Sequence, residues 1–369
     1  MTRADFRSLA NHYIRNITPY QPGKPIEEVE RELGIPAVIK LASNENPLGA
    51  SPHALAAAQK MLQKSRLYPD GGSYELKQVL AHFLQVDFAQ LTIGNGSENI
   101  LELIVKTYLT QDSAAILSQY AFLTIQLLIK SYGAEMCTVP AYQFGHDIQQ
   151  MIAAVNDKTR IIFVVNPNNP TGTYTNADDM LLLLNSVPSN VLIVVDEAYH
   201  EYIDRADYLD LIPLLNQYPN LILTRTFSKA YGLAGMRLGY SISSPEIADM
   251  LNRARLPFNV NSIAASAACA ALLDQEHIQK SIALNASGMQ YLAEEFKKLQ
   301  LNYIPSLGNF ITLDVRQNGV DIYQKLLYQG VIVRPLGAYG LPTHLRVTVG
   351  TTEENEKFLR ALCEVSGEI

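Results

Sequence analysis

Short apolar runs rich in valine and isoleucine alternate along the chain with longer stretches whose apolar residues recur at helical spacing. Strands of a parallel sheet are buried on both faces, so they read as continuous apolar runs rather than as alternating ones. The pattern therefore predicts an α/β fold with a mostly parallel central sheet flanked by helices. We expect strands at residues 114–117, 161–165, 191–195, 221–224 and 238–241, and helices at 99–110, 122–132 and 178–185.

Two regions depart from this pattern. Residues 18–25 hold several helix breakers, which predicts an irregular N-terminal arm. After Pro257 an alanine-rich, helix-prone stretch leads into a second α+β pattern, with strands expected at 311–315, 331–334 and 345–349. We expect three parts: an arm over residues 1–45, a large domain over 46–274, and a smaller α+β C-terminal domain over 275–369.

Composition narrows the class of protein. A chain of 369 residues exceeds the roughly 250–300 residues at which a single core stops growing, in agreement with two domains. The formal net charge of −7 argues against binding to nucleic acid or to an anionic membrane surface. No window approaches the roughly 20 apolar residues of a membrane span, and the first residues lack the apolar core of a signal peptide. We therefore expect a cytoplasmic enzyme.

The three cysteines offer no obvious chemistry. Cys137, Cys269 and Cys363 are too few and too widely separated for a disulfide framework or a zinc knuckle. None is flanked by the histidine and the positive charge that favour a nucleophilic thiolate. We interpret them as packing residues in a reducing compartment.

Lys229 is the strongest single candidate for chemistry. It follows the apolar run at 221–224 and lies among hydroxyls and glycines, with Arg237 eight positions further on. A lysine held in this way at a strand end is a positioned amine rather than a solvated surface cation. Such an amine can form a Schiff base with an aldehyde cofactor, of which pyridoxal 5′-phosphate is the commonest.

Asp196 and Tyr199 follow the apolar run at 191–195. A carboxylate at the end of a buried strand is costly unless its charge is used, and a cationic ring nitrogen is one such use. The phenol of Tyr199 could donate to the 3′-oxygen of the same cofactor. A helix cap is the simpler role for Asp196 alone.

The acidic run that begins at Asp196 also suits a metal site or a nucleotide site. His200 and Glu201 could add metal ligands, but the chain has no second cluster and no histidine pair at i,i+4 spacing. The run also resembles the acidic motif of nucleoside-triphosphate-driven motors, but no phosphate-binding Gly-x-x-x-x-Gly-Lys-Ser/Thr is present. Neither metal nor nucleotide is predicted.

Asn169 follows the run at 161–165 within a turn that contains two prolines and a glycine. The turn can aim side-chain amides into the crevice at the strand ends, where Asn169 could bind the same 3′-oxygen as Tyr199. A turn built only for its backbone is the alternative.

A candidate phosphate site precedes the helix predicted from residue 99. Small residues at 94–97 leave backbone amides free at the positive end of the helix dipole. Asn99 stands where a dinucleotide-binding motif has its last glycine, so a single phosphate fits better than a pyrophosphate. The backbone at Ser97 and Glu98 and the side chains of Thr226, Ser228 and Arg237 are the expected phosphate contacts.

Tyr120 follows the run at 114–117 and could stack on a flat cofactor. Aromatic residues after strands more often belong to the core. Its position beside the other strand-end residues favours the cofactor role.

Taken together, these segments resemble the fold-type-I pyridoxal-phosphate aminotransferases and, among them, the histidinol-phosphate aminotransferase family. The resemblance covers nearly the whole chain. It rests on residues 20–25 (YQPGKP), 41–49 (LASNENPLG), 68–71 (YPDG), 168–172 (NNPTG), 196–199 (DEAY), 228–237 (SKAYGLAGMR) and 345–350 (LRVTVG).

The resemblance implies a role for each matching residue. Lys229 is expected to form the internal aldimine and then to move the proton between substrate and cofactor carbons. Asp196 is expected on the pyridine nitrogen, with Asn169 and Tyr199 on the 3′-oxygen. Tyr68 is implied to reach the cofactor phosphate of the neighbouring subunit, which would make the enzyme a homodimer with shared active sites. Small molecules are the only other partners expected.

The implied reaction is transamination between L-histidinol phosphate and 2-oxoglutarate, a step of histidine biosynthesis. Tyr20, Asn46, Arg334 and Arg346 are the expected substrate contacts, because arginines can hold a carboxylate or a phosphate in alternate half-reactions. For Arg346 a surface position at a strand edge is the alternative.

Two departures from the family pattern stand out. Glu98 and Asn99 exchange the acid and amide found in many members, and Tyr120 lacks the usual preceding proline. Other functions of the same fold also remain open. These are an aromatic amino-acid aminotransferase, a phosphothreonine decarboxylase and a non-catalytic ligand-binding protein.

Overall fold

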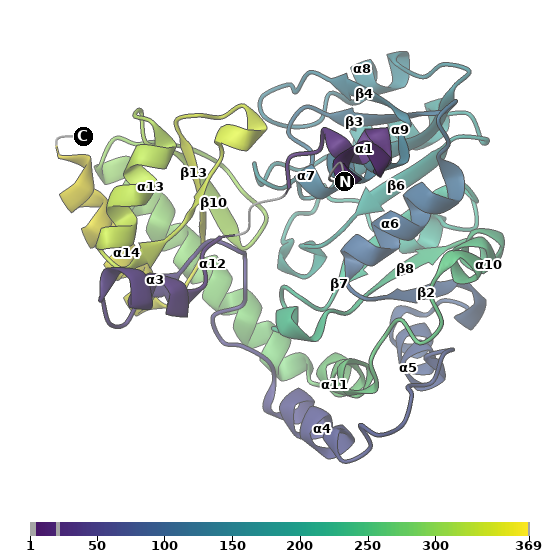
Figure 1. Ribbon diagram of the computed structural model, residues 1–369, viewed down its shortest axis with the longest axis horizontal. Coiled ribbons are helices and arrows are strands. Elements are labelled where there is room, and N and C mark those ends of the chain that lie inside the picture. The colour runs from purple at the N-terminus through teal and green to yellow at the C-terminus, as the bar shows by residue number, and fades with distance from the viewer. Residues whose placement is uncertain (1–4, 20–22, 368–369) are drawn as a thin grey trace.

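The computed structural model describes residues 5–19 and 23–367. Its largest element is a seven-stranded sheet in the order β2-β8-β7-β6-β5-β3-β4 (Figure 1). β8 runs antiparallel to both of its neighbours, and the other pairs are parallel. The predicted mostly parallel sheet is therefore confirmed. Its strands are β2 (Leu91–Gly94), β3 (Ala114–Ser118), β4 (Glu135–Val139), β5 (Thr159–Val165), β6 (Leu192–Asp196), β7 (Leu221–Thr226) and β8 (Gly239–Ser243).

Helices cover both faces of this sheet because successive side chains of a strand point to opposite sides. Ile162 and Val164 of β5 pack on one face, whereas Phe163 and Val165 pack on the other. The first face carries α4 (Pro52–Leu62), α5 (Tyr74–Leu84), α8 (Ile148–Ala153), α9 (Ala177–Ser186) and α11 (Ser262–Leu273). The second carries α6 (Ser97–Tyr108), α7 (Leu123–Tyr132) and α10 (Pro245–Ala254).

A second, antiparallel sheet has the order β12-β13-β10-β9. The strand expected at 331–334 is divided, because Ile332 pairs with Lys40 whereas Arg334 pairs with Arg346. The elements of this region are β1 (Ile39–Lys40), α12 (Gln275–Lys298), β9 (Asn302–Ile304), β10 (Phe310–Asp314), α13 (Gly319–Tyr328), β11 (Val331–Ile332), β12 (Arg334–Pro335), β13 (His344–Thr348) and α14 (Thr352–Ser366).

The helix α12 joins the two halves of the molecule (Figure 1). Ile278, near its start, packs in the core of the seven-stranded sheet, whereas Leu292 and Phe296 pack in the core of the antiparallel sheet. Part of the predicted arm belongs to the second core, since Val38 and Leu41 are buried against C-terminal residues. The limits 1–45, 46–274 and 275–369 remain a prediction, and we propose that α12 is shared between the two domains.

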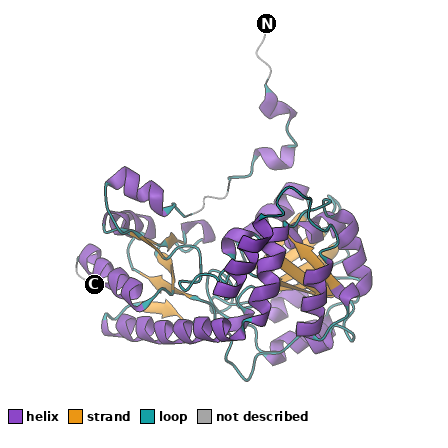
Figure 2. Cartoon of the chain, turned by 90° about the horizontal axis from the view of Figure 1, so that it is seen from below, coloured by secondary structure: helices purple, strands orange, loops and turns teal. Residues whose placement is uncertain are grey.

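The start of the chain holds three more helices. The segment that carries α1 extends outward from the rest of the molecule (Figure 2), whereas α2 packs against α7. Within residues 5–19 and 23–367, no helix has the length and apolar character needed to cross a membrane. These helices and the short 3₁₀ segments are α1 (Phe6–Leu9), α2 (His12–Arg15), α3 (Ile26–Leu33), η1 (Phe88–Gln90), η2 (His200–Tyr202), η3 (Ile212–Leu214), η4 (Ala234–Met236) and η5 (Gly337–Tyr339).

Candidate active site

A cavity of about 360 Å³ opens at the carboxyl ends of β5, β6 and β7. Its other walls come from the arm at residues 42–45 and from β13, so both sheets contribute to it. Ligands of α/β sheets bind at this edge because the loops after neighbouring strands converge there. Many of the predicted site residues line it: Ser97, Glu98, Asn169, Asp196, Tyr199, Thr226, Ser228, Lys229, Arg237 and Arg346.

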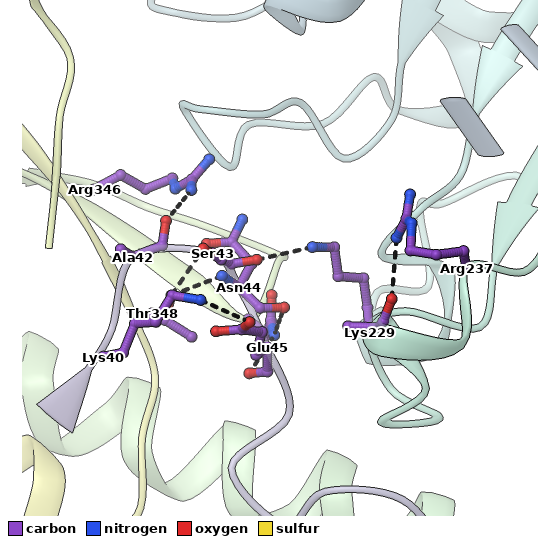
Figure 3. A network of polar contacts seen from close by, with 11 residues as sticks. Lys40, Ala42, Ser43, Asn44, Glu45, Lys229, Arg237, Arg346 and Thr348 are labelled. Carbon is purple, nitrogen blue, oxygen red and sulfur yellow. Dashed lines mark hydrogen bonds and ion pairs between the residues drawn. The ribbon is translucent and has the colours of Figure 1, made fainter. Parts of the chain in front are cut away.

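Lys229 presents its amine inside this cavity. Its Nζ donates to the backbone oxygen of Ser43 at 3.0 Å (Figure 3). Burial, together with the positive charge of Arg346, lowers the pKa of the Lys229 amine to about 8. A substantial fraction of this amine is therefore neutral near physiological pH, as nucleophilic attack on a carbonyl requires.

Asp196 is the last residue of β6 and is 4% exposed. Thr224 donates its hydroxyl to Asp196 Oδ1 at 2.9 Å. Burial nevertheless raises the pKa of the Asp196 carboxyl to about 6, because desolvation outweighs this hydrogen bond. A cation in the cavity would remove that penalty, so the carboxylate fits a protonated ring nitrogen.

The start of α6 provides the anion site. Gly96 precedes the helix with φ of +90°, and no side chain caps the first turn, which leaves its backbone amides to a ligand. The backbone of Gly239 packs directly against this turn. A Cβ at Gly239 would lie 2.4 Å from the backbone nitrogen of Ser97, so no side chain fits there. Arg237 lies beside this turn, with its Nη2 3.4 Å from Glu98 Oε2. This arrangement fits one phosphate group.

Tyr199, Asn169 and Arg346 line the same cavity. Tyr199 Oη accepts a hydrogen bond from Asn44 Nδ2 at 2.8 Å, and burial raises the pKa of the phenol to about 12, so it stays protonated. Arg346 Nη1 donates to Asn169 Oδ1 at 2.6 Å, and its Nη2 donates to the backbone oxygen of Ala42 at 2.6 Å. The amide nitrogen of Asn169 is then the group that can donate to a ligand.

Tyr120 does not line the cavity. Its ring stacks against Phe144 at a centroid distance of 6.1 Å and packs beside Tyr339. Phe122, two residues further along, lines the cavity instead. β3 ends at Ser118 and α7 begins at Leu123, so both aromatic residues lie in the turn between them. Phe122 is therefore the ring of this segment that can contact a flat ligand.

Three other predicted residues, Tyr68, Asn46 and Arg334, are not among those that line the cavity. Tyr68 is 83% exposed, and its ring stacks on Phe258 at 4.9 Å. Asn46 is buried with its amide donated to the backbone oxygen of Ala230 and to Ser281 Oγ, both at 2.8 Å, and it does not reach the cavity. Arg334 lies on β12 directly opposite Arg346 of β13. Tyr20 lies outside the described residues.

Several residues of the site were not predicted. Ser43, Asn44 and Glu45 belong to a segment noted only for its resemblance, although all three line the cavity. Behind the site, Arg225 Nε and Glu197 Oε2 form an ion pair of 2.8 Å whose side chains are 5% and 0% exposed. The local sequence gives no signal for this pair, because only the adjacency of β6 and β7 in the sheet brings the two side chains together. Within the described residues, no group of three histidine, cysteine, aspartate or glutamate side chains could hold a metal ion.

Fold and site together define an enzyme whose cavity is lined by a lysine amine, a carboxylate and a phenol, next to the uncapped start of α6. The model of the family described as aminotransferase class I and II matches residues 36–362. The chain belongs to this family.

Relatives cover almost the whole chain. Histidinol-phosphate aminotransferase 1 of Nitrosococcus oceani is 49% identical over 362 residues, 98% of each chain. Histidinol-phosphate aminotransferase 2 of Pseudomonas aeruginosa is 50% identical and covers 98% of this chain and 99% of its own. The structure of histidinol-phosphate aminotransferase from Sinorhizobium meliloti in complex with pyridoxal-5′-phosphate has a TM-score of 0.90, 28% identity and 98% coverage of both chains. The predicted fold type and family are confirmed.

Proposed function

We propose that this protein is a pyridoxal 5′-phosphate-dependent transaminase that interconverts L-histidinol phosphate and 2-oxoglutarate with imidazole acetol phosphate and L-glutamate. One observation carries the chemistry: the Lys229 amine and the Asp196 carboxylate line the same cavity, next to the uncapped start of α6. The substrate rests on relatives named histidinol-phosphate aminotransferase that are 49% and 50% identical over 98% of this chain. A cytoplasmic location belongs to the same proposal.

The cavity residues fit the proposed cofactor group by group. The backbone at Ser97 and Glu98 and the side chains of Thr226, Ser228 and Arg237 would hold the phosphate. Asp196 would hold the ring nitrogen, whose positive charge would offset the cost of burying the carboxylate. Asn169 and Tyr199 would donate to the ring oxygen, and Phe122 would cover the ring. When bound, the cofactor supplies an aldehyde and a conjugated ring that accepts electrons from the substrate carbon.

Lys229 would act twice. Its neutral Nζ is the nucleophile toward the aldehyde, and the pKa of about 8 makes that form accessible. The same Nζ would then take the proton from the substrate Cα and deliver it to the reacting carbon of the cofactor. Its hydrogen bond to the oxygen of Ser43 offers a place to hold the amine between these roles.

Arg346 is the proposed anchor for the acidic group of each substrate. Arg346 is 7% exposed, and its Nε has no hydrogen-bond partner among the described residues. Arg334, across the strand pair, is the second candidate. A carboxylate or a phosphate at this place would receive a charge-assisted hydrogen bond, as both half-reactions require.

A homodimer is part of the proposal. Leu67, Tyr68, Leu256 and Phe258 are exposed apolar or aromatic side chains, 53%, 83%, 72% and 47% exposed respectively. Exposed apolar groups of this kind support a contact with a second subunit. Tyr68 would reach the phosphate site of that subunit.

The test is a titration of the purified protein with pyridoxal phosphate. A visible absorption band that Lys229→Ala abolishes supports the cofactor assignment, whereas a protein that stays colourless overturns it. Adding L-histidinol phosphate without a keto acid should convert the band in a single half-reaction. A kcat/KM that is higher for phenylalanine than for L-histidinol phosphate would indicate an aromatic amino-acid aminotransferase. Release of carbon dioxide would indicate a decarboxylase.

A further inference from the structure

Three consecutive residues of the arm contact three chemical groups of the cavity. The backbone oxygen of Ala42 accepts from Arg346 Nη2 at 2.6 Å, and that of Ser43 accepts from Lys229 Nζ at 3.0 Å. Figure 3 shows these residues lying between Arg346 on one side and Lys229 on the other. Asn44 contacts the third group through its side chain, which donates from Nδ2 to Tyr199 Oη at 2.8 Å. The third contact is the only one of the three made by a side chain.

The position of Asn44 is fixed from several directions. Its side chain is 1% exposed, and its backbone has φ of +54°, a left-handed conformation that asparagine adopts more readily than most residues. Its backbone nitrogen donates to Thr348 Oγ1 at 2.9 Å, and its backbone oxygen accepts from Asn309 Nδ2 at 3.0 Å. The residue therefore joins the arm to β13 and to the loop before β10.

The hydrogen bonds also fix which way the amide of Asn44 points. The hydroxyl of Thr348 accepts from the backbone of Asn44, so its own hydrogen is free to be donated, and it lies 3.2 Å from Asn44 Oδ1. Oδ1 must accept there, which turns Nδ2, a pure donor, toward Tyr199. The oxygen of Tyr199 is then an acceptor from Asn44.

A phenol oxygen that accepts from Asn44 must direct its own proton elsewhere. Tyr199 lines the cavity, and burial raises the pKa of its phenol to about 12, so the proton is present at neutral pH. With Asn44 as a donor on one side, the remaining direction for the O–H is the cavity. The amide thus excludes the competing orientation, in which the phenol would donate to the arm.

We propose that Asn44 is a positioning residue that turns the phenolic proton of Tyr199 toward the bound cofactor. Thr348 holds the amide, and it lies two residues after Arg346 on the same face of β13. The arm and β13 therefore fix two things at once: the direction of this proton and the position of Arg346, the proposed substrate-binding arginine. The inference rests on the proposed function, because the acceptor of the proton is the cofactor ring oxygen.

The test uses Asn44→Asp, which keeps the shape of the side chain and tolerates the left-handed backbone. A carboxylate only accepts, so the phenol must turn and donate to it, and the ring oxygen loses one of its two proposed donors while Asn169 remains. A donated hydrogen bond stabilises the ionised ring oxygen and lowers the pH midpoint of the visible band. We expect Asn44→Asp to raise this midpoint by about one pH unit, the size given by one lost hydrogen bond to a charged group.

The control is the same substitution in a Tyr199→Phe background. The new negative charge shifts the pH midpoint in both backgrounds. The loss of the phenolic donor adds to this shift only in the protein that has Tyr199. The two substitutions should therefore be non-additive, with a clearly smaller shift in the Tyr199→Phe protein. Equal shifts in both backgrounds, or no shift in either, would overturn the role of Asn44.

Two more variants keep the test decisive if Asn44→Asp does not fold. Asn44→Gly accepts the left-handed backbone and removes the amide, and Thr348→Val releases the amide from its anchor. Each leaves the phenolic proton without a fixed direction, so each should raise the midpoint by less than Asn44→Asp does, without an added charge and only when Tyr199 is present. A wild-type protein without any visible band would instead contradict the proposed function, so the two failures are distinguishable.

Discussion

The buried carboxylate of Asp196 should make the cofactor-free protein less stable at neutral pH than a variant without that charge. In the folded protein burial raises the pKa of this carboxyl from its ordinary 3.8 to about 6. At about 1.36 kcal/mol per pKa unit, the difference corresponds to about 3 kcal/mol. Asp196→Asn removes the charge and keeps an oxygen that can accept from Thr224. We expect it to raise the free energy of unfolding by about 3 kcal/mol above pH 6.

The pH dependence gives the prediction its sign. Between pH 3.8 and about 6 the folded wild type binds more protons at this carboxyl than the unfolded chain does. Its stability therefore falls as the pH rises through this window, whereas Asp196→Asn is unaffected by the group. The advantage of the variant should be complete above about pH 6 and should disappear toward pH 4.

The assay is chemical unfolding of the two cofactor-free proteins, followed by far-ultraviolet circular dichroism from pH 4.5 to pH 8. Asp249→Asn serves as the matched control, because that carboxylate is 54% exposed in an ion pair and its loss should change stability by less than about 0.5 kcal/mol. With cofactor bound, the wild type should recover stability that the variant does not. A cofactor-free Asp196→Asn protein that is no more stable than wild type at pH 7.5 would refute the reasoning.

Three further predictions concern other parts of the molecule. The rate at which cofactor-free protein captures pyridoxal phosphate should rise with pH through about 8, as the Lys229 amine loses its proton, and a flat stopped-flow profile from pH 6.5 to 9 would contradict this. Glu197→Gln leaves the buried charge of Arg225 unpaired and should lower the free energy of unfolding by about 3–5 kcal/mol, against less than about 1 kcal/mol for Glu135→Gln at an exposed ion pair. Tyr68→Phe should raise the cofactor dissociation constant about tenfold through loss of one hydrogen bond to the phosphate, with the dimer intact by sedimentation, and unchanged affinity would remove Tyr68 from the site.

Much of the site could be predicted because parallel strands have a simple geometry. β5, β6 and β7 are neighbours in the sheet, so the residues at or just after their ends meet at one edge, among them Asn169, Asp196 and Lys229. Each of these residues also has a local signature, such as an acid after an apolar run. Strand β4 was not predicted, since it lies at the edge of the sheet with partly exposed residues and lacks a continuous apolar run.

The choice between nearby aromatic residues was beyond the sequence. Tyr120 and Phe122 lie two positions apart in a turn, where no fixed period says which ring points into the cavity. In the structure Tyr120 packs against Phe144 and Tyr339, which belong to distant segments, whereas Phe122 lines the cavity. Asn46 was predicted to contact the substrate. In the structure its side-chain amide instead donates to the backbone oxygen of Ala230 and to Ser281 Oγ of α12, which connects the arm to that helix.

The sequence by itself determined the α/β class and the family, and it predicted the strand-end chemistry proposed around Lys229, because these depend on local patterns and on residues at strand ends. Only the tertiary structure decided what closes the cavity. Asn44 and Tyr199 are 155 positions apart, and Arg346 reaches Ala42 across 304. Such contacts depend on how β13 and the arm pack over the sheet edge, and packing between distant segments leaves no periodic signal along the chain.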